Sequence, residues 1–163
     1  MTMTIKVGDR IPEGTFMTMG ENGLETVSSS DVFKGKTVVL FGVPGAFTPT
    51  CSEQHLPGFV AQADAIKGKG VATIACTSVN DPFVLRAWAK ASGADDCITM
   101  LADDKADFAR AIGVDVDLSA AGLGTRSHRY AMIVDDGVIK YFAIEDSTAA
   151  HEKATAEKLL ASF

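Results

Sequence analysis

Short apolar runs and longer stretches of helical character alternate through the first half of the chain. Two runs, at residues 37–43 and 71–79, have the length and the β-branched content of buried strands. Residues 50–67 follow the first run and residues 81–92 follow the second, and both have helical character. The pattern predicts the order strand, helix, strand, helix.

The second half continues the alternation and then changes to paired strands. Residues 97–103 predict a short strand and residues 105–113 a helix. Residues 129–144 predict two strands, because the dipeptide Asp136-Gly137 near their middle is a strong signal for a tight hairpin turn. The amphipathic segment 149–163 predicts a final helix that packs its apolar face on the core.

These elements together predict an α/β protein with a thioredoxin-like fold, in which helices flank a central mixed sheet. We expect one domain over residues 1–163, because the length is ordinary for a domain and we find no internal repeat, low-complexity tract or linker. The glycine-rich segment 122–127 matches a dinucleotide-binding loop only weakly, because it lacks the third glycine and precedes a strand. A Rossmann fold is not favoured.

Composition and charge narrow the classes of function. With 47% hydrophobic and 22% charged residues, the chain can bury an ordinary globular core. A formal net charge of -6 argues against nucleic acid as a partner, since nucleic-acid binding requires clustered Lys and Arg. The first ten residues contain no long apolar run, so neither a signal peptide nor a membrane partner is expected. We therefore expect a cytoplasmic protein.

The three cysteines, Cys51, Cys76 and Cys97, do not form a pattern typical of disulfide scaffolds or metal sites. An odd count in a chain large enough to fold without cross-links argues against a disulfide framework. The chain has no CxxC pair and no Cys/His grouping of zinc-binding type, so we expect neither a metal nor another cofactor. A functional thiol in this chain would therefore be expected to act through its chemical reactivity.

Cys51 is predicted to lie in the first turn of a helix. Thr48 suits the N-cap with its hydroxyl toward the first-turn amides, and Pro49 suits the next position, where no amide donor is needed. The free amides and the helix dipole at this end favour a thiolate. Thioredoxin chemistry uses a second cysteine three residues away, and Thr48 occupies that place. The segment predicts a site with one thiol.

A lone intracellular cysteine is more often a small buried hydrophobic residue, and Cys51 taken by itself fits that interpretation. Its surroundings favour chemistry instead, because Pro44, Gly45 and the Pro57-Gly58 dipeptide give this segment a rigid and specific backbone. Pro57 removes a helical hydrogen bond and is expected to kink the helix about two turns in.

The segment PGAFTPTCSEQHLPGF resembles the active-site segment of the peroxiredoxins, in particular their type II or peroxiredoxin-5-like branch. The pattern P-x-x-x-T-x-x-C is met by Pro44, Thr48 and Cys51, and CSxxHLPGF is typical of that branch. The resemblance continues through residues 75–90, 101–113 and 124–139, so it covers most of the chain.

The resemblance implies a thiol peroxidase in which Cys51 attacks a hydroperoxide and becomes a sulfenic acid. The hydroxyl of Thr48 and the amide of Cys51 would bind the peroxide, and Pro44 would cover the pocket. An arginine at a strand edge completes the family's site, and the family pattern R-[FY]-[AS]-M places it at Arg129. Arg126 is the competitor, and we favour Arg129.

Three further residues are expected around the substrate pocket. His55, four residues after Cys51, could act as a base for the thiol, but a packing or orienting role is favoured. Gly45 is expected to line the pocket, and Phe47 to line either the pocket or an interface. The resemblance also implies a homodimer formed through the loops around the active site.

The sequence leaves open how the sulfenic acid is reduced. Cys76 occupies a place where some type II members carry a resolving cysteine, but a core cysteine on a buried strand is nearly as well supported. The C-terminal cysteine used by other members is absent, and Cys97 has no assigned role. The reductant would be thioredoxin after a Cys51–Cys76 bridge forms, or glutathione with glutaredoxin, and we favour the second.

Two other functions remain as alternatives. One is a redox sensor or interaction protein in which Cys51 oxidises slowly. The other is a thiol-disulfide oxidoreductase, which Thr48 disfavours because the mixed disulfide would have no neighbouring thiol to resolve it.

Overall fold

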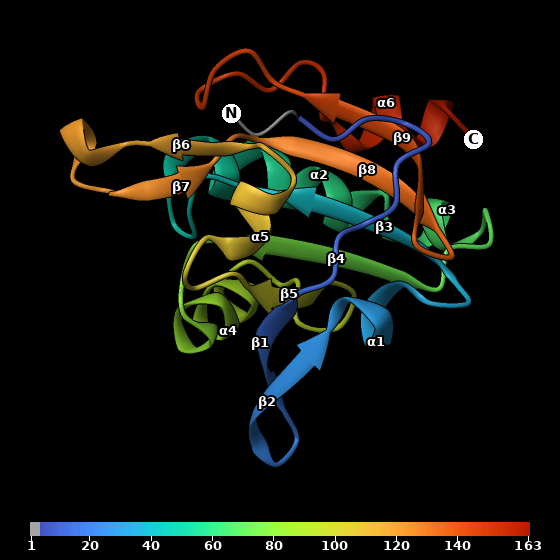
Figure 1. Cartoon of the computed structure of the whole chain (residues 1–163), viewed down its shortest axis with the longest axis horizontal. Helices are drawn as coiled ribbons and strands as arrows, with labels where there is room; N and C mark the ends of the chain where they lie inside the picture. The colour runs from blue at the N-terminus through green and yellow to red at the C-terminus, as the bar shows by residue number, and fades with distance from the viewer. Residues whose placement is uncertain (1–3) are drawn as a thin grey trace.

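The computed structural model of the chain describes residues 4–163, and a seven-stranded mixed sheet lies at its centre (Figure 1). The strand order is β2-β1-β5-β4-β3-β8-β9. The strands are β1 Thr15–Gly20, β2 Gly23–Ser28, β3 Thr37–Gly42, β4 Thr73–Ser78, β5 Thr99–Ala102, β8 Tyr130–Asp135 and β9 Val138–Ile144. Strands β3, β4 and β5 are parallel, and the other pairs are antiparallel. The thioredoxin-like fold expected from the sequence is confirmed.

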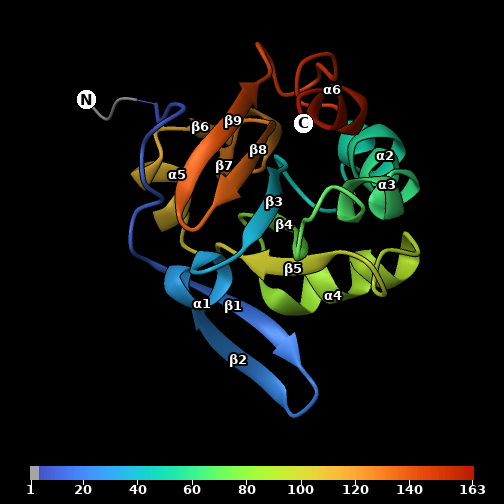
Figure 2. The same cartoon turned by 90° about the vertical axis from the view of Figure 1, so that its right-hand side faces the viewer.

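Helices cover both faces of this sheet (Figure 2). They are α1 Ser29–Phe33, α2 Leu56–Ala61, α3 Ala63–Lys67, α4 Pro82–Ala91, α5 Asp107–Ala111 and α6 Ala156–Ala161, with a π-helical turn η1 at Cys51–His55 and a 3-10 turn η2 at Ser119–Ala121. Helices α2, α3, α4 and α6 pack on one face, and α1 and α5 on the other. Both faces of the central strands β3, β4 and β8 are therefore removed from water.

Strand β3 shows why the central apolar runs are continuous. Val39 and Phe41 belong to the core under α2 and α4, whereas Val38 and Leu40 belong to the core under α1 and α5. Because successive side chains of a strand point to opposite faces, a strand covered on both sides needs apolar residues at every position. All four of these side chains are fully buried.

The predicted crossover units are present, and six elements were missed, namely β1, β2, α1, β6 Asp115–Asp117, η2 and β7 Thr125–Ser127. Strands β1 and β2 form a hairpin that extends from the edge of the sheet (Figure 1). Most of its residues are half-buried or exposed, so they show no clear apolar face. A second small sheet pairs β6 with β7 and includes the glycine-rich segment set aside above.

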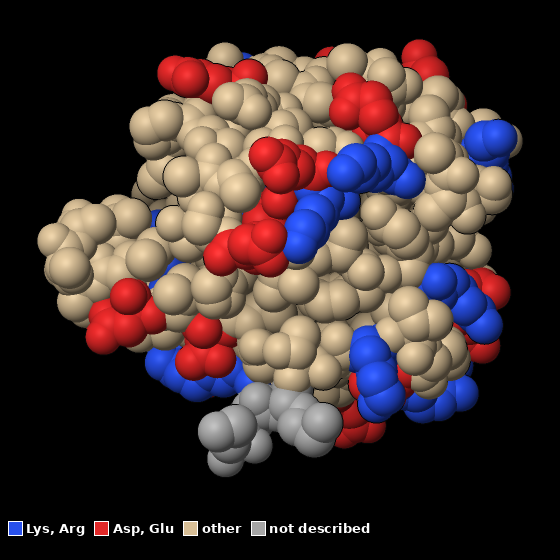
Figure 3. Space-filling model, turned by 90° about the horizontal axis from the view of Figure 1, so that it is seen from above, with Lys and Arg blue, Asp and Glu red and all other residues tan. Residues whose placement is uncertain are grey.

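One face of the molecule carries charges of both signs (Figure 3). On the face in Figure 3, Lys and Arg side chains lie beside Asp and Glu side chains, with no large patch of one sign. In residues 4–163, no helix is long and apolar enough to cross a bilayer.

Candidate active site

Cys51 is fully buried at the beginning of the helical segment that follows β3. The helical turn begins at Pro49, and the carbonyl of Thr48 accepts a hydrogen bond from the amide of Ser52 at 3.0 Å. From Cys51 the backbone widens into the π turn η1, in which the amide of Leu56 donates to the carbonyl of Cys51. The sulfur therefore lies within the first helical turn, as the spacing predicts.

Pro57 explains the wide turn. It has no amide hydrogen with which to continue the ordinary i to i−4 pattern, and the structure accommodates it with a π-helical turn before α2. The continuous helix predicted over residues 50–67 is instead η1, α2 and α3, with Gln62 between the two α-helices. The local disturbance expected from Pro57 takes the form of this π turn.

Thr48 uses its hydroxyl differently from the prediction. The Oγ1 atom donates its hydrogen to the carbonyl of Gly45 at 2.6 Å, so it closes the turn before the helix instead of pointing to the first-turn amides. Gly45 itself is closely packed, because a Cβ atom there would lie 2.5 Å from Nη1 of Arg126 and 3.2 Å from Cγ2 of Thr48. This turn therefore tolerates only glycine at position 45 without a shift of Arg126.

Arg129 lies beside the sulfur and is 1% exposed. Its Nη2 atom donates to Sγ of Cys51 at 3.3 Å and to the carbonyl of Thr148 at 3.0 Å. Its Nε atom donates to the carbonyl of Ala150 at 3.1 Å, and its Nη1 atom is 3.1 Å from Nδ1 of His55. These four contacts hold the planar guanidinium in one orientation against the thiol.

His55 is fully buried, and its ring connects Arg129 to the main chain. The Nε2 atom is 2.9 Å from the carbonyl of Ala154, which can only accept, so Nε2 carries the ring hydrogen and Nδ1 accepts from Arg129. Burial, and then the charge of Arg129, hold the pKa of His55 well below its ordinary value. A neutral ring whose free lone pair is engaged by Arg129 fits the orienting role and disfavours the role of base.

Arg126 and Phe47 lie at the outer side of the site. Arg126 donates to the carbonyls of Leu123 at 2.9 Å and Pro44 at 3.2 Å, so the structure places Arg129 at the sulfur and Arg126 at the neighbouring loop. Phe47 has a φ of 64° and is 56% exposed. Of the two environments expected for Phe47, this exposure fits an interface better than a pocket.

Cys76 lies on β4 in the same core as Cys51, paired with Phe41 on β3 and Met100 on β5. Burial, followed by the proximity of Cys51, raises its pKa well above the ordinary value, so Cys76 is held as a thiol. Cys97 is half-buried at the start of the segment leading to β5, and burial raises its pKa too. All three cysteines are unbonded.

The contacts that sequence reasoning missed come from the main chain. The carbonyls of Thr148, Ala150 and Ala154 hold Arg129 and His55, and all three belong to the segment between β9 and α6. Every residue type has a carbonyl, so the sequence gives no signal for them.

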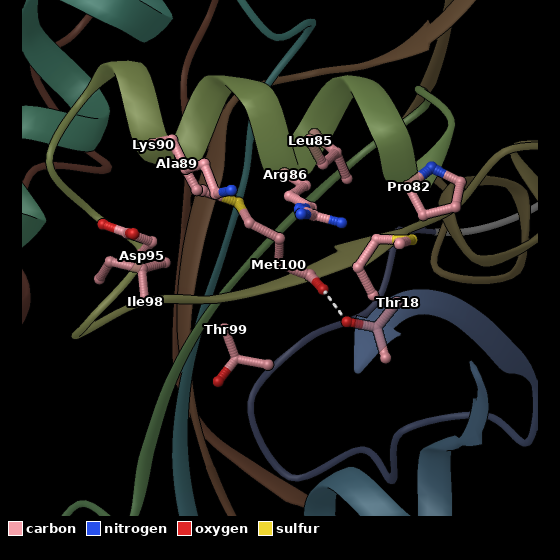
Figure 4. A pocket seen from close by; sticks show the side chains of 11 residues that line it. Thr18, Pro82, Leu85, Arg86, Ala89, Lys90, Asp95, Ile98, Thr99 and Met100 are labelled. Carbon is pink, nitrogen blue, oxygen red and sulfur yellow. Dashed lines mark hydrogen bonds between the residues drawn. The ribbon is translucent and has the colours of Figure 1, made fainter. Parts of the chain in front are cut away.

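A hollow of about 250 Å³ lies between α4, β5 and β1, apart from the residues described above. Figure 4 shows its apolar side chains together with Arg86 and Lys90 of α4, and the hydrogen bond of 2.9 Å from Thr18 Oγ1 to the carbonyl of Met100. None of the site residues predicted from the sequence lines it. Within residues 4–163, no group of three or more His, Cys, Asp and Glu side chains is arranged to hold a metal ion.

Comparison with known proteins identifies the relatives of this chain. The Redoxin family model matches residues 6–160. The chloroplastic peroxiredoxin-2E-2 of rice (Oryza sativa subsp. japonica) is 46% identical over 162 residues, which cover 96% of this chain and 72% of that protein. Reduced Prx3 of Vibrio vulnificus, solved in complex with H2O2, has a TM-score of 0.92 and 45% identity over 98% of this chain and 99% of the other. Peroxiredoxin 5 of Alvinella pompejana has a TM-score of 0.84 and 38% identity, with 97% of each chain covered.

The names of the relatives correct one expectation. The peroxiredoxin-2E proteins of rice and Arabidopsis thaliana are described as chloroplastic, and the peroxiredoxin-2F of Arabidopsis as mitochondrial. The cytoplasmic location expected from the N-terminal sequence is therefore wrong. The expectation depended on the lack of an apolar leader, and targeting sequences for these organelles are amphipathic rather than apolar.

Proposed function

The chain belongs to the Redoxin family as a peroxiredoxin of the type II, peroxiredoxin-5-like branch, and on this premise we propose that Cys51 is its peroxidatic cysteine. The protein is a thiol peroxidase. The assignment of Cys51 is carried by one observation, the position of the Arg129 guanidinium. This group makes four polar contacts, and one of them joins its Nη2 atom to the sulfur of Cys51 at 3.3 Å.

In the proposed reaction the thiolate of Cys51 attacks the nearer oxygen of a hydroperoxide. A sulfur–oxygen bond forms as the O–O bond breaks, which leaves a sulfenic acid on Cys51 and releases water or an alcohol after the leaving oxygen takes a proton. The sulfur is oxidised and the peroxide is reduced. The permanent charge of Arg129 favours both the thiolate and the negative charge on the departing oxygen. The Vibrio vulnificus relative solved with H2O2 supports hydrogen peroxide as one substrate.

Thr48, Pro44 and Gly45 shape the approach to the sulfur in this proposal. Because the hydroxyl of Thr48 donates its hydrogen to the carbonyl of Gly45, its oxygen can accept a hydrogen bond from the peroxide. The carbonyl of Pro44 accepts a hydrogen bond from Arg126 at 3.2 Å, which restrains the proline beside the site. A covered pocket excludes water and strengthens each polar contact inside it.

Trp88 offers a direct measurement of the reaction. It is the only tryptophan of the chain, and its Nε1 atom donates to Oγ of Ser52, the residue after Cys51, at 2.9 Å. We expect its fluorescence to change when reduced protein is mixed with hydrogen peroxide in a stopped-flow instrument. Cys51→Ser should abolish the change and Cys97→Ser should leave it unaltered. An oxidation rate no faster than that of free cysteine would refute the assignment of Cys51.

We propose that an external thiol, glutathione acting with glutaredoxin, reduces the sulfenic acid. Support comes from Cys76, which is fully buried in the sheet and whose pKa is raised well above its ordinary value, so it supplies little of the thiolate that must attack a sulfenic acid. Thioredoxin remains the alternative reductant, after a Cys51–Cys76 bridge.

Intact-mass measurement distinguishes the two routes. Reduced protein and its Cys76→Ser variant are treated with one equivalent of hydrogen peroxide, with and without glutathione. A glutathione adduct in both proteins supports direct capture. A loss of two hydrogens in the wild-type protein, absent from Cys76→Ser, would show the internal bridge and contradict the proposal.

We also propose that residues 1–163 act as one domain and that two chains form a homodimer. The single-domain proposal is supported by a sheet whose strands come from both ends of the described chain and by a family match over residues 6–160.

The dimer is supported by Phe47 and Phe83, which are 56% and 59% exposed. The segments that carry them are joined by a hydrogen bond of 3.0 Å from the amide of Ala46 to Asn80.

A further inference from the structure

The loop that joins β9 to α6, residues 145–155, surrounds the buried site with main-chain oxygens. Four of its carbonyls accept hydrogen bonds from side chains at or beside the site. The pairs are Thr148 with Arg129 Nη2 (3.0 Å), Ala150 with Arg129 Nε (3.1 Å), Ala154 with His55 Nε2 (2.9 Å) and Ala149 with Thr50 Oγ1 (3.3 Å). The path of the backbone therefore decides where these acceptors lie.

Glu145 holds the 145–155 loop from its inner side. One carboxylate oxygen, Oε2, accepts from the amides of Glu152, Lys153 and Ala154 at 2.9, 2.7 and 2.6 Å. The residue is 4% exposed. Hydrogen bonds to a carboxylate are about twice as strong as those between neutral groups, and a buried carboxylate that lost them would be costly. Residues 152–154 are thereby bent around this single oxygen.

Glu145 is also joined directly to Arg129 through the main chain. The amide of Glu145 donates to the carbonyl of Arg129 at 2.9 Å, which extends the β8–β9 pairing one residue beyond Tyr130 and Ile144. The end of this hairpin thus fixes the backbone of Arg129 and, through the carboxylate, the loop that holds its guanidinium.

We propose that Glu145 is a positioning residue for the peroxidase reaction: its carboxylate sets the path of the 145–155 loop and so orients Arg129 at the sulfur. The inference rests on the proposed roles of Cys51 and Arg129. In the described part of the chain, the side-chain hydrogen bonds of Glu145 go to amides of the loop and none goes to Arg129 or Cys51, so it acts through other groups.

The test compares two reactions of Cys51 in Glu145→Ala and wild-type protein, across a range of pH. Oxidation by hydrogen peroxide, followed by the fluorescence of Trp88, needs the thiolate and an oriented Arg129. Alkylation by iodoacetamide, followed by mass, needs the thiolate and access of the reagent to it, but it does not need Arg129 to be oriented toward a breaking O–O bond. We expect the ratio of the peroxide rate to the alkylation rate to fall at least about tenfold at every pH, since small misplacements of a catalytic group cost up to about a hundredfold.

Asp146→Ala is the matched control. Asp146 is the neighbouring carboxylate and pairs with Lys153 at 2.9 Å on the surface, so its loss should leave both rates within about twofold of wild type. If circular dichroism shows that Glu145→Ala does not fold, Glu145→Gln decides the test. This variant keeps the size and one acceptor oxygen but loses the charge, and its ratio should fall about threefold to tenfold.

One outcome would refute the role of Glu145, and a different outcome would refute the proposed function. A folded Glu145 variant whose rate ratio stays within about twofold of wild type overturns the positioning role, because simple loosening of the loop would speed both reagents alike. A wild-type Cys51 that reacts with peroxide no faster than free cysteine would instead refute the proposed function, whatever the behaviour of Glu145.

Discussion

Arg129 makes contacts at the residue scale that a lysine cannot reproduce. Its Nε, Nη1 and Nη2 atoms reach two carbonyls, a histidine ring and the sulfur of Cys51 at once. A lysine has a single ammonium group and cannot span these positions. We expect Arg129→Lys to slow the oxidation of Cys51 by hydrogen peroxide about a hundredfold or more, the usual cost of losing a donor to a developing negative charge.

The matched control for that variant is Arg126→Lys, which alters the arginine bonded to Pro44 and Leu123. Stopped-flow fluorescence should show a loss below about tenfold, because within residues 4–163 the guanidinium of Arg126 bonds to main-chain carbonyls and not to the sulfur. Equal losses in the two variants would contradict the assignment of Arg129.

His55 should make the stability of the protein depend on pH. Its pKa lies well below the ordinary value because of burial and then the charge of Arg129, so below about pH 6.5 the unfolded chain binds a proton that the folded protein excludes. The stabilisation is complete above about pH 6.5 and is lost as the pH falls toward the lowered pKa, at up to about 1.4 kcal/mol per pH unit.

Urea unfolding between about pH 7.5 and pH 5 measures this effect. The free energy of unfolding should fall less steeply in His55→Gln, whose amide can still donate to the carbonyl of Ala154. His151→Gln is the control: burial and Arg129 also lower the pKa of His151, but that ring is only half-buried and its contribution is smaller. A His55→Gln profile parallel to that of the wild type would contradict the expectation.

The sequence could indicate those site residues whose side chains have a distinctive chemistry of their own. Cys51 after Thr48-Pro49, and Arg129 at a strand edge, follow from residue type, spacing and family resemblance. Glu145 could not be indicated in this way, because its importance comes from three amides that fold back onto it seven to nine residues later. Its role depends on tertiary structure alone.

At the scale of single elements, replacing either of two glycines by alanine should change the free energy of unfolding, and the two changes should have opposite signs. In β3, a Cβ atom on Gly42 would overlap the ring of the fully buried Tyr130 on β8. Gly58 lies within α2 and its nearest neighbour would be Cβ of Ala156 at 4.0 Å. We expect Gly42→Ala to lower the free energy of unfolding by about 1–3 kcal/mol and Gly58→Ala to raise it by about 1 kcal/mol.

Urea unfolding of both variants checks the pair. A neutral Gly42→Ala would mean that Tyr130 can move aside despite its burial. A destabilising Gly58→Ala would mean that α2 and α6 approach more closely than their 4.0 Å contact indicates.

Elements with one consistent environment were predicted well from the sequence. Strands β3 and β4 are buried on both sides and helix α4 is amphipathic, begins with an Asp81 cap and places Trp88 in the core, so periodicity found all three. The β1–β2 hairpin lies at the sheet edge with most side chains half in water, which removes the alternation that identifies a strand. The π turn at Cys51 depends on which amide bonds which carbonyl, and side-chain patterns do not report that.

The whole-molecule prediction concerns assembly. If Phe47 and Phe83 form the centre of the proposed dimer interface, Phe47→Asp and Phe83→Asp should each shift the protein toward monomer, because a charge would be buried without a partner. Leu24→Asp is the control, since Leu24 is 51% exposed on the β1–β2 hairpin. Sedimentation velocity measures the result. A dimer that persists in both Phe variants but dissociates in Leu24→Asp would place the interface at the hairpin.

The use of carbonyl groups to hold Arg129 has a consequence for how this protein can change during evolution. Thr148, Ala149 and Ala150 contribute oxygens that survive almost any substitution, so mutations can accumulate there without selection against them. Glu145 cannot be replaced in this way, because its side chain makes the bonds. The number of residues between Glu145 and residues 152–154 is constrained as well. Among divergent descendants, insertions and deletions in this segment should therefore be rarer than amino-acid replacements.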